Sequence, residues 1–339
     1  MRLHLNDLPH LMRRAALLAP LVLATAAASV GLIGTAQAQQ AFPSKLFTVI
    51  VPYPAGGASD FVARLVQPEL QKQLGQQMLV DNVGGVSGAL GIQKMLGAPA
   101  DGYTQVLATP MELVLAPLAL NAVKFKSDDL RLAGLIAYTS VVMLARKDLP
   151  ANTLDEFIAW AKGKEPTYGS VGIGSLYHLQ GEKLAQATGL KMTHIPYKGG
   201  GPLITDLGGG QVDIAFFPLA GPVPGMIKEG KVKVLGITQA NAHPMFPDVP
   251  PMSHHKLLGD FNFDLWIGLQ VPKSTPDAVV ARLNAAMNEV IKSADVRKGM
   301  EGTGSVMAKP MTPAELDKFY TSEIARYRAV AKSVKLEPQ

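Results

Sequence analysis

The sequence of 339 residues contains no cysteine. Disulfide bonds, cysteine nucleophiles, iron–sulfur clusters and zinc sites with thiolate ligands are therefore excluded. A chain without cross-links must be stabilised by burial of apolar side chains. This favours a large α/β core over a small disulfide-bonded scaffold.

Runs of charge are also absent. Lysine and arginine together number 32 against 27 acidic residues, which gives a formal net charge of +5, and the basic residues are scattered along the chain. This distribution is typical of a solvated surface, so we expect no nucleic-acid partner. His254 and His255 are adjacent, and no H-E-x-x-H motif occurs. We therefore expect neither a metal site nor a cofactor.

Beyond the first 38 residues, no apolar run is long enough to span a membrane. The richest one, residues 111–120, is interrupted by Glu112 and Pro117 and falls short of the roughly 20 residues that a spanning helix needs. We therefore expect no membrane span in this part of the chain.

The first 38 residues have a different composition. An arginine-containing start precedes the apolar stretch Ala15–Ile33, which is followed by the small-residue pattern Ala-Gln-Ala. This order predicts a secretion leader over residues 1–38, cleaved after Ala38, and places the mature protein in the periplasm. The adjacent arginines Arg13 and Arg14 leave the choice between the general and the twin-arginine export route open.

Strand and helix patterns alternate in the first half of the chain. Leu46–Val51 is a short apolar run typical of a buried strand. Apolar residues at helical spacing predict a helix over Asp60–Leu74, ended by Gly75, and Pro68 inside it predicts a kink or a division into two helices. Further strands are expected at residues 78–80 and 106–108. This alternation predicts an α/β protein with a parallel sheet.

The second half repeats the strand–loop–helix order. Glycine-rich junctions occur in the segments 167–184, 194–207 and 211–221. Three later helices are expected to start at hydroxyl residues that cap the first turn, namely Thr153, Thr275 and Thr312. These signals define the fold and carry no chemistry.

Two glycine-rich loops have the composition of an anion site. "VPYPAGGASD" (residues 51–60) and "GSVGIGSLYH" (residues 169–178) each run from a strand into a helix. Glycine lets a ligand approach the free amides at a helix N-terminus, where the dipole is positive. Neither loop matches G-x-x-x-x-G-K-[ST] or G-x-G-x-x-G, so a nucleotide site is not indicated. The alternative is that these glycines only form tight turns.

A catalytic arrangement is weakly indicated. Ser175 and His178 are three residues apart at a predicted helix start, but the G-x-S-x-G motif of a hydrolase serine is missing. A capping serine beside a surface or pocket histidine is the simpler interpretation. Asp60 is most simply a residue that stabilises the helix dipole.

Five stretches carry a resemblance to a known family. They are "VPYPAGGASDFVARLVQPELQKQLGQQMLVDN", "APADGYT", "TYGSVGIGSLYHL", "HIPYKGGGPLITDLGGGQVDIAF" and "VPKSTPDAVVARLNAAMNEV". In this order they closely resemble the periplasmic receptors of tripartite tricarboxylate transporters, also called Bug-type solute-binding proteins. The resemblance implies a type II periplasmic-binding-protein fold, with two α/β lobes joined by crossing strands. Lobe 1 would comprise residues 39–138 and 263–339, and lobe 2 residues 139–262.

The resemblance also implies a binding site. By position, the first loop contributes Tyr53, Pro54, Ala55, Gly56, Gly57, Ser59 and Asp60, and the second loop contributes Ser170, Gly172, Ser175, Tyr177 and His178. Thr109 and Tyr197 are expected to line the pocket as well. The implied ligand is a small organic acid, held by backbone amides, hydroxyl groups and ordered water.

Two departures from the family pattern affect this site. Residues 81–88 read D-N-V-G-G-V-S-G, where the family commonly has E-N-R-P-G-A-G-G. Many relatives carry an aspartate after the strand that ends here in Phe216, Phe217 and Pro218. Because neighbours on a strand face opposite sides, we expect one phenylalanine, with Phe217 as the candidate, to face the cleft. Loss of the aspartate predicts a ligand without an ammonium group and with an apolar or aromatic body.

The combined interpretation is a receptor without enzymatic activity, working as a monomer. It would capture a small carboxylate by hinge closure and deliver it to the membrane permease subunits of a tripartite transporter. Two alternatives remain: a periplasmic sensory receptor for a two-component system and a hydrolase that uses Ser175 and His178.

Overall fold

The computed structural model describes residues 42–333. The expected leader and its cleavage site lie outside this range. The strands are β1 (Phe47–Val51), β2 (Met78–Asn82), β3 (Thr104–Ala108), β4 (Leu130–Arg146), β5 (Thr167–Ser170), β6 (Thr193–Pro196), β7 (Ile214–Pro218), β8 (Val232–Ile237), β9 (Asp264–Pro272) and β10 (Val306–Met307).

The α-helices are α2 (Ala58–Leu74), α3 (Ala89–Leu96), α4 (Ala116–Ala119), α5 (Leu154–Ala161), α6 (Leu176–Thr188), α7 (Gly200–Gly208), α8 (Val223–Lys228), α9 (Asp277–Val290), α10 (Ala294–Glu301) and α11 (Pro313–Ser333). Short 3₁₀ turns form η1 (Val86–Gly88), η3 (Ser127–Asp129) and η4 (Met252–His254), and η2 (Met111–Leu115) is a π-helical turn.

The described strands form a mixed sheet in the order β2-β1-β3-β9-β4-β7-β5-β6, and β8 and β10 also pair with β4. β1 pairs in parallel with β2 and β3, and β5 pairs in parallel with β6 and β7. The predicted parallel sheet is therefore present at both ends. In between, β4 and β9 pair with each other and with their other neighbours in antiparallel fashion.

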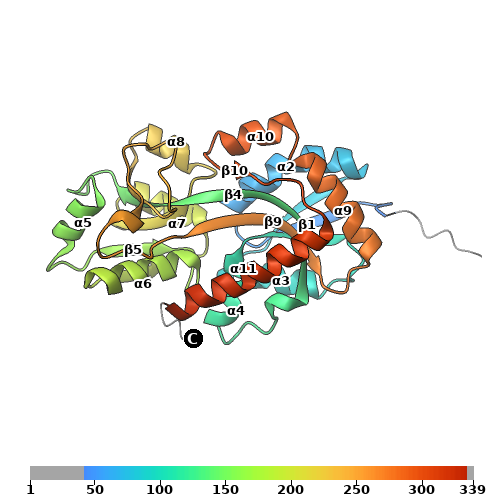
Figure 1. Cartoon of the computed structure of the whole chain (residues 1–339), viewed down its shortest axis with the longest axis horizontal. Coiled ribbons are helices and arrows are strands. Elements are labelled where there is room, and N and C mark those ends of the chain that lie inside the picture. Colours follow the sequence, from blue (N-terminus) through green and yellow to red (C-terminus); the bar gives the residue numbers. More distant parts are fainter. Residues whose placement is uncertain (1–41, 334–339) are drawn as a thin grey trace, which may run out of the picture. The chain divides into compact units, whose positions relative to one another are not determined.

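β4 and β9 join two lobes (Figure 1). Residues 130–140 of β4 pair with β9, whereas residues 141–146 pair with β7 and β8. The first lobe contains β1, β2 and β3 with α2, α3, α9 and α10, and the second contains β5 to β8 with α5 to α8. The α/β architecture with crossing strands is the one that the resemblance implies.

The helix α2 shows how the local sequence is realised. It ends where predicted, because Gly75 adopts a left-handed φ of 71° and donates its N–H to the carbonyl of Gln71. Pro68 lies inside the helix without dividing it, so of the two predicted outcomes, a kink or a division, the division is wrong. Phe47, Val49 and Val51 of β1 belong to the core beneath α2.

The predicted helix caps are present at two of three positions. The Thr153 hydroxyl accepts the N–H of Glu156 at 3.1 Å, and the Thr312 hydroxyl accepts the N–H of Glu315 at 3.3 Å. Glu315 returns a bond to the N–H of Thr312 at 2.7 Å, which completes a capping box. Thr275 does not cap α9, because the helix begins at Asp277 after Pro276 and no side chain caps it.

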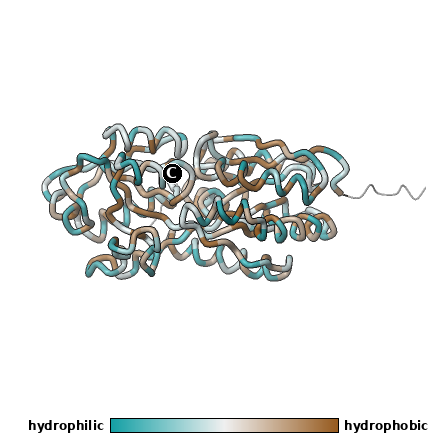
Figure 2. Tube along the Cα trace, turned by 90° about the horizontal axis from the view of Figure 1, so that it is seen from above, coloured by the Kyte–Doolittle hydropathy of each residue, from teal (hydrophilic) through white to brown (hydrophobic). Residues whose placement is uncertain are grey.

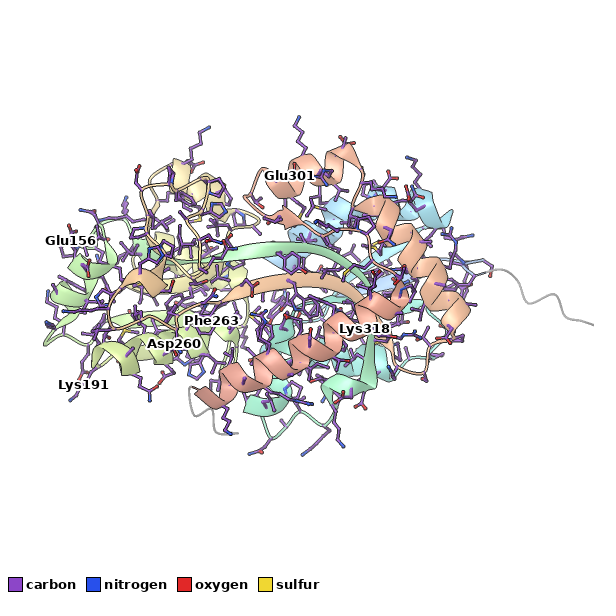
Figure 3. All side chains as sticks on the ribbon, viewed as in Figure 1. Glu156, Lys191, Asp260, Phe263, Glu301 and Lys318 are labelled. Atoms are coloured by element: carbon purple, nitrogen blue, oxygen red, sulfur yellow. The ribbon has the colours of Figure 1, made fainter. Side chains whose placement is uncertain are left out.

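The side chains separate into an apolar interior and a polar surface. Figure 2 shows hydropathy changing from residue to residue along the peripheral helices, and Figure 3 shows the exposed side chains of Glu156, Lys191, Glu301 and Lys318 at the periphery. Within residues 42–333, no helix is both long enough and apolar enough to cross a membrane.

Candidate functional site

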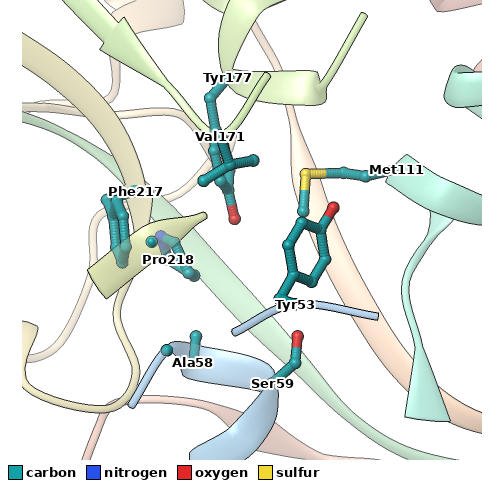
Figure 4. A pocket seen from close by; sticks show the side chains of 10 residues that line it. Tyr53, Ala58, Ser59, Met111, Val171, Tyr177, Phe217 and Pro218 are labelled. Atoms are coloured by element: carbon teal, nitrogen blue, oxygen red, sulfur yellow. The ribbon is translucent and has the colours of Figure 1, made fainter. Parts of the chain in front are cut away.

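A cavity lies between the two lobes and contains about 310 Å³ of empty space, part of it open to solvent. The first lobe contributes Tyr53, Gly57, Ala58, Ser59 and Met111, and the second contributes Val171, Tyr177, Gly200, Phe217 and Pro218. Figure 4 shows the side chains of these residues around a common space. Its mainly apolar lining with a few polar groups suits the hydrocarbon part of a small organic molecule.

The N-terminus of α2 opens onto this cavity. Ala58 and Ser59, the first two residues of the helix, line the wall. The amides in a first helical turn have no intrahelical acceptor, and the helix dipole places positive partial charge there. This end of α2 therefore offers hydrogen-bond donors to an anion without any cationic side chain.

The adjacent glycines Gly56 and Gly57 have different roles. Gly56 has a φ of 84°, and its N–H donates to Oδ2 of Asp60 at 3.0 Å. Gly57 has an ordinary extended φ of −85°, and a Cβ there would contact only the Pro54 carbonyl at 3.7 Å. Gly56 therefore shapes the turn, whereas Gly57 leaves room at the cavity wall.

Asp60 stabilises the loop and does not line the cavity. Its carboxylate accepts hydrogen bonds from Nε of Arg64 at 3.0 and 3.1 Å. Burial alone would raise the pKa of Asp60, but the bonds from Arg64 and Gly56 outweigh burial and lower it. The negative charge of Asp60 is thus neutralised at the start of α2 by Gly56 and Arg64. This agrees with the interpretation of Asp60 as a residue that stabilises the helix N-terminus.

Tyr177 presents a hydroxyl group to the cavity. It lies in the first turn of α6 and is 2% exposed, and Figure 4 shows its oxygen pointing toward the space beside Pro218. No protein hydrogen-bond partner of this hydroxyl is found among the described residues. Burial raises its pKa well above the usual value, so the group stays a neutral donor.

The cavity continues into a second hollow toward β9. This hollow shares Ala58, Ser59, Met111, Tyr177 and Pro218 with the cavity and adds Val62, Thr109, Thr139, Ala220, Leu265, Trp266 and Ile267. Thr109 therefore lies where the sequence analysis expected a lining residue. Neither hollow is lined by a lysine, arginine, histidine, aspartate or glutamate within the described part of the chain.

A third hollow lies on the other side of Tyr53. It is lined by Tyr53, Gly85, Val86, Ser87, Gly88, Leu120, Val171, Gly172, Ile173, Pro196, Tyr197 and Lys198. Tyr197 does reach this hollow, but its hydroxyl donates to Oδ2 of Asp206 at 2.8 Å. The predicted residues Gly172 and Tyr197 thus lie near the cavity without lining it.

Two other predicted residues, Pro54 and Ala55, lie where the two lobes contact each other. A Cβ added to Gly199 would lie 2.7 Å from Cδ of Pro54, and a Cβ added to Gly84 would lie 2.8 Å from the same atom. The Pro54 ring is therefore held between a first-lobe and a second-lobe glycine. The carbonyl of Ala55 lies across from Gly201, where a Cβ would be 3.9 Å away.

Ser170, Ser175 and His178 do not line the cavity or its continuation. The Ser170 hydroxyl bonds Nε2 of His194 at 2.7 Å, and the His178 ring stacks on the His194 ring with centroids 4.2 Å apart. Burial lowers the pKa of His194 to about 4 and also lowers that of His178. Both rings are therefore neutral near pH 7 and supply no charge for an anion.

The Ser175–His178 pair is a helix cap and not a nucleophile with its base. The Ser175 hydroxyl accepts the backbone N–H of His178 at 3.3 Å. Nδ1 of the His178 ring accepts the N–H of Gly174 at 3.1 Å. The Ser175 oxygen therefore bonds the backbone of His178 and not its ring, whereas a hydrolase would need a bond to the imidazole.

The phenylalanines of β7 face opposite sides. Phe217 lines the cavity and stacks on Tyr177 with ring centroids 5.9 Å apart, whereas Phe216 packs on Phe261 at 5.7 Å. A Cβ on Gly200 would lie 2.8 Å from Cζ of Phe217. The aromatic wall thus depends on a glycine at the start of α7.

Sequence reasoning missed several lining residues and one buried acid. Met111, Val171 and Trp266 have no polar motif that would single them out. Glu112 is completely buried and does carry a signal, because an acid inside an apolar run must find partners when it is buried. It accepts bonds from Thr109 and from the Tyr53 hydroxyl at 3.2 Å.

Comparison with known proteins identifies the class. Residues 62–336 match the model of the tripartite tricarboxylate transporter family receptor. The chain is 36% identical over 299 residues to a UPF0065 protein from the TAR-I ttuE-ttuC' intergenic region of Agrobacterium vitis, covering 87% of this chain and 86% of that protein. The chain belongs to the tripartite tricarboxylate transporter receptor family.

Solved structures agree in fold. The periplasmic binding protein BugD superposes with a TM-score of 0.82 at 28% identity, covering 88% of this chain and 100% of that one. MatC from Rhodopseudomonas palustris with bound malate superposes with a TM-score of 0.80 at 31% identity, covering 85% of this chain and 99% of that one. Rpa4515 from R. palustris with adipate superposes with a TM-score of 0.82 at 27% identity, covering 88% of this chain and 100% of that one. These neighbours are solute-binding proteins and not enzymes, and they confirm the expected class and two-lobed fold.

Proposed function

We propose that this protein is an extracytoplasmic receptor that encloses a small organic carboxylate between its lobes and delivers it to a membrane transporter. The observation that carries the proposal is the start of α2 at the wall of an uncharged cavity. Free amides there hold a carboxylate through charge-assisted hydrogen bonds, each contributing about 1.5–3 kcal/mol. Similar chains bind malate and adipate, which supports this ligand class.

The binding mechanism is closure of the lobes on the ligand. We assign residues 39–138 and 263–339 to lobe 1 and residues 139–262 to lobe 2, supported by the change of β4 partners between Ser140 and Val141. A ligand that touches both α2 and Tyr177 bridges the lobes. It therefore stabilises the closed state through its higher affinity for that state.

The chemistry of the cavity narrows the ligand further. The predicted site residues that line it and its continuation are Tyr53, Gly57, Ser59, Thr109, Tyr177 and Phe217. Phe217 and Pro218 stand where an acid would be needed to pair with an ammonium group. The ligand is therefore a carboxylate with an apolar or aromatic body and without a free amino group.

Export and delivery complete the proposal. The leader pattern over residues 1–38 supports a periplasmic location, and the family supports permease subunits of a tripartite transporter as partners. The receptor works as a monomer. A sensory receptor for a two-component system remains the second candidate, because capture by lobe closure serves signalling equally well.

A thermal-shift screen with a panel of organic acids tests the proposal, because a ligand of the native state raises stability by mass action. Acids that raise the melting temperature are then titrated by calorimetry. We expect saturable binding of apolar carboxylates and no turnover of a generic ester. Uptake by membranes that contain the cognate permease would separate delivery from signalling.

A further inference from the structure

Glu112 places a carboxyl group directly behind the cavity wall. It lies on η2, directly after the lining residue Met111 and three residues after the lining residue Thr109. Its Oε1 accepts the N–H of Thr109 at 2.6 Å, and its Oε2 accepts the hydroxyls of Thr109 at 2.9 Å and Tyr53 at 3.2 Å. Two hydroxyl groups of the cavity wall are therefore bound to one buried acid.

The surroundings of Glu112 provide no compensating positive charge. Its hydrogen-bond partners, on the described part of the chain, are its own backbone amide, the backbone and side chain of Thr109 and the phenol of Tyr53. Tyr177 on α6 is the other titratable group that faces it, and Tyr327 on α11 lies beyond Tyr177. On the side of η1, Gly88 packs against Cβ of Glu112. The Ser87 carbonyl oxygen lies 3.4 Å from the Tyr53 hydroxyl and is a second acceptor for it.

The protonation state of Glu112 decides what the cavity wall offers to a ligand. A carboxylate can only accept hydrogen bonds, so it holds the hydrogens of both the Tyr53 and Thr109 hydroxyls. A carboxylic acid donates its own hydrogen to one of these oxygens. That hydroxyl then becomes an acceptor from Glu112, and its own hydrogen is free for another acceptor. For Tyr53 this acceptor is the Ser87 carbonyl at 3.4 Å, whereas Thr109 lines the hollow and can donate to a ligand there.

We infer that Glu112 becomes fully protonated, taking the missing proton from solvent, when a carboxylate occupies the cavity, and that this exchange sets the preference of the site for anions. The inference rests on the proposed carboxylate-receptor function. Proton uptake removes the repulsion between two anions in a site of low polarity and supplies one further donor for the ligand.

The acidity of Glu112 makes this exchange accessible. Burial raises its pKa to about 7, although the bonds from Thr109 and Tyr53 favour the carboxylate. In the free protein near neutral pH both forms are therefore populated. A bound anion raises this pKa further and completes the protonation.

Proton uptake is measured directly by calorimetry. Benzoate, hexanoate and adipate are titrated into the protein at pH 6, 7 and 8, each in two buffers of different ionisation enthalpy. We expect uptake of about 0.5 proton per bound acid at pH 7 and about 0.9 at pH 8. The apparent affinity should be about tenfold weaker at pH 8 than at pH 6, because only the protonated fraction binds well.

Two variants test the assignment to Glu112. Glu112→Gln imitates the protonated form, so we expect no proton uptake, an affinity that changes less than about twofold between pH 6 and 8, and binding at pH 8 about tenfold tighter than in the wild type. Glu289→Gln, an exposed residue of α9 that pairs with Lys292, is the matched control and should behave like the wild type.

The outcomes separate the inference from the proposed function. Acid binding without proton uptake by the wild type would overturn the inference and leave the receptor function standing, and this result needs no variant. Proton uptake that persists in Glu112→Gln would overturn the assignment to this residue. Failure of all three acids to bind would overturn the carboxylate-receptor function and this inference with it.

Discussion

The Ser87 hydroxyl donates a hydrogen bond of 2.6 Å to the carbonyl oxygen of Ile173, and this bond joins the two lobes beside the cavity. Val86 and Ser87 both have a φ of 51°, in the left-handed region, which costs about 1–3 kcal/mol for a residue other than glycine. A Cβ on Gly172 would lie 2.6 Å from the Ser87 hydroxyl oxygen. The turn at η1 and Gly172 thus fit closely against each other where the two lobes meet.

Ser87→Ala is expected to weaken ligand binding about fivefold, because it removes roughly 1 kcal/mol that stabilises the closed state. Calorimetry measures the affinity, and small-angle scattering measures the opening of the unliganded protein. Ser87→Gly loses the same bond but relieves the left-handed strain, so its folded state should be more stable than that of Ser87→Ala. Equal affinity in all three proteins would show that this bond does not contribute to closure.

Tyr177→Phe should lower the affinity for a carboxylate about tenfold, since a hydrogen bond to a charged group contributes about 1.5 kcal/mol or more. The stability of the unliganded protein should hardly change, because the hydroxyl has no protein partner among residues 42–333. Calorimetry and thermal unfolding measure the two quantities. An unchanged affinity would remove Tyr177 from the ligand contacts.

Phe217→Asp should shift the ligand preference of the cavity from apolar acids toward amino acids. The wild type is expected to bind aromatic and aliphatic acids more tightly than aspartate or glutamate, because an ammonium group beside Phe217 would be buried without a partner. The variant places a carboxylate there and should gain affinity for amino acids. A competition assay with acids of matched size is suitable, and tighter binding of amino acids by the wild type would contradict the prediction.

Glu112 should make the unliganded protein less stable as the pH rises. Its folded pKa of about 7 lies above the usual pKa of 4.5 for a glutamate, so its contribution is complete below about pH 4.5 and is lost as the pH rises through 7. The loss approaches about 3 kcal/mol at high pH. Urea unfolding at pH 5 and pH 8 measures it, and Glu112→Gln should lack this component. If the free energy of unfolding of the wild type and of Glu112→Gln changed with pH in parallel, the raised pKa of Glu112 would be contradicted.

Binding should depend weakly on salt. The cavity and its continuation toward β9 have no cationic lining residue, and hydrogen bonds from enclosed amides are screened less than a surface basic patch. Calorimetric titration at low and high ionic strength should give affinities that differ by less than about threefold. A decrease of several powers of ten would point to a surface cationic site, for example around Lys198.

The sequence by itself determined the elements and the family. A short apolar run located β1 and apolar residues at helical spacing located α2, because such patterns report the burial of one local segment. Gly75 ended α2 as predicted, since few other residues adopt its backbone conformation freely. The predicted division of α2 at Pro68 was wrong. Proline removes a single hydrogen bond of the helix, and the packing of α2 on the first-lobe core compensates for this loss.

Only the tertiary structure decided which residues face the ligand cavity. Ser59 lines it and Asp60 does not, although they are neighbours, because one helical step turns the side chain away and toward Arg64. Trp266 reaches the site from β9, about 200 residues along the chain from α2. Glu112 became significant once folding buried it against Tyr53. Such contacts depend on how distant segments pack, and no local pattern encodes that arrangement.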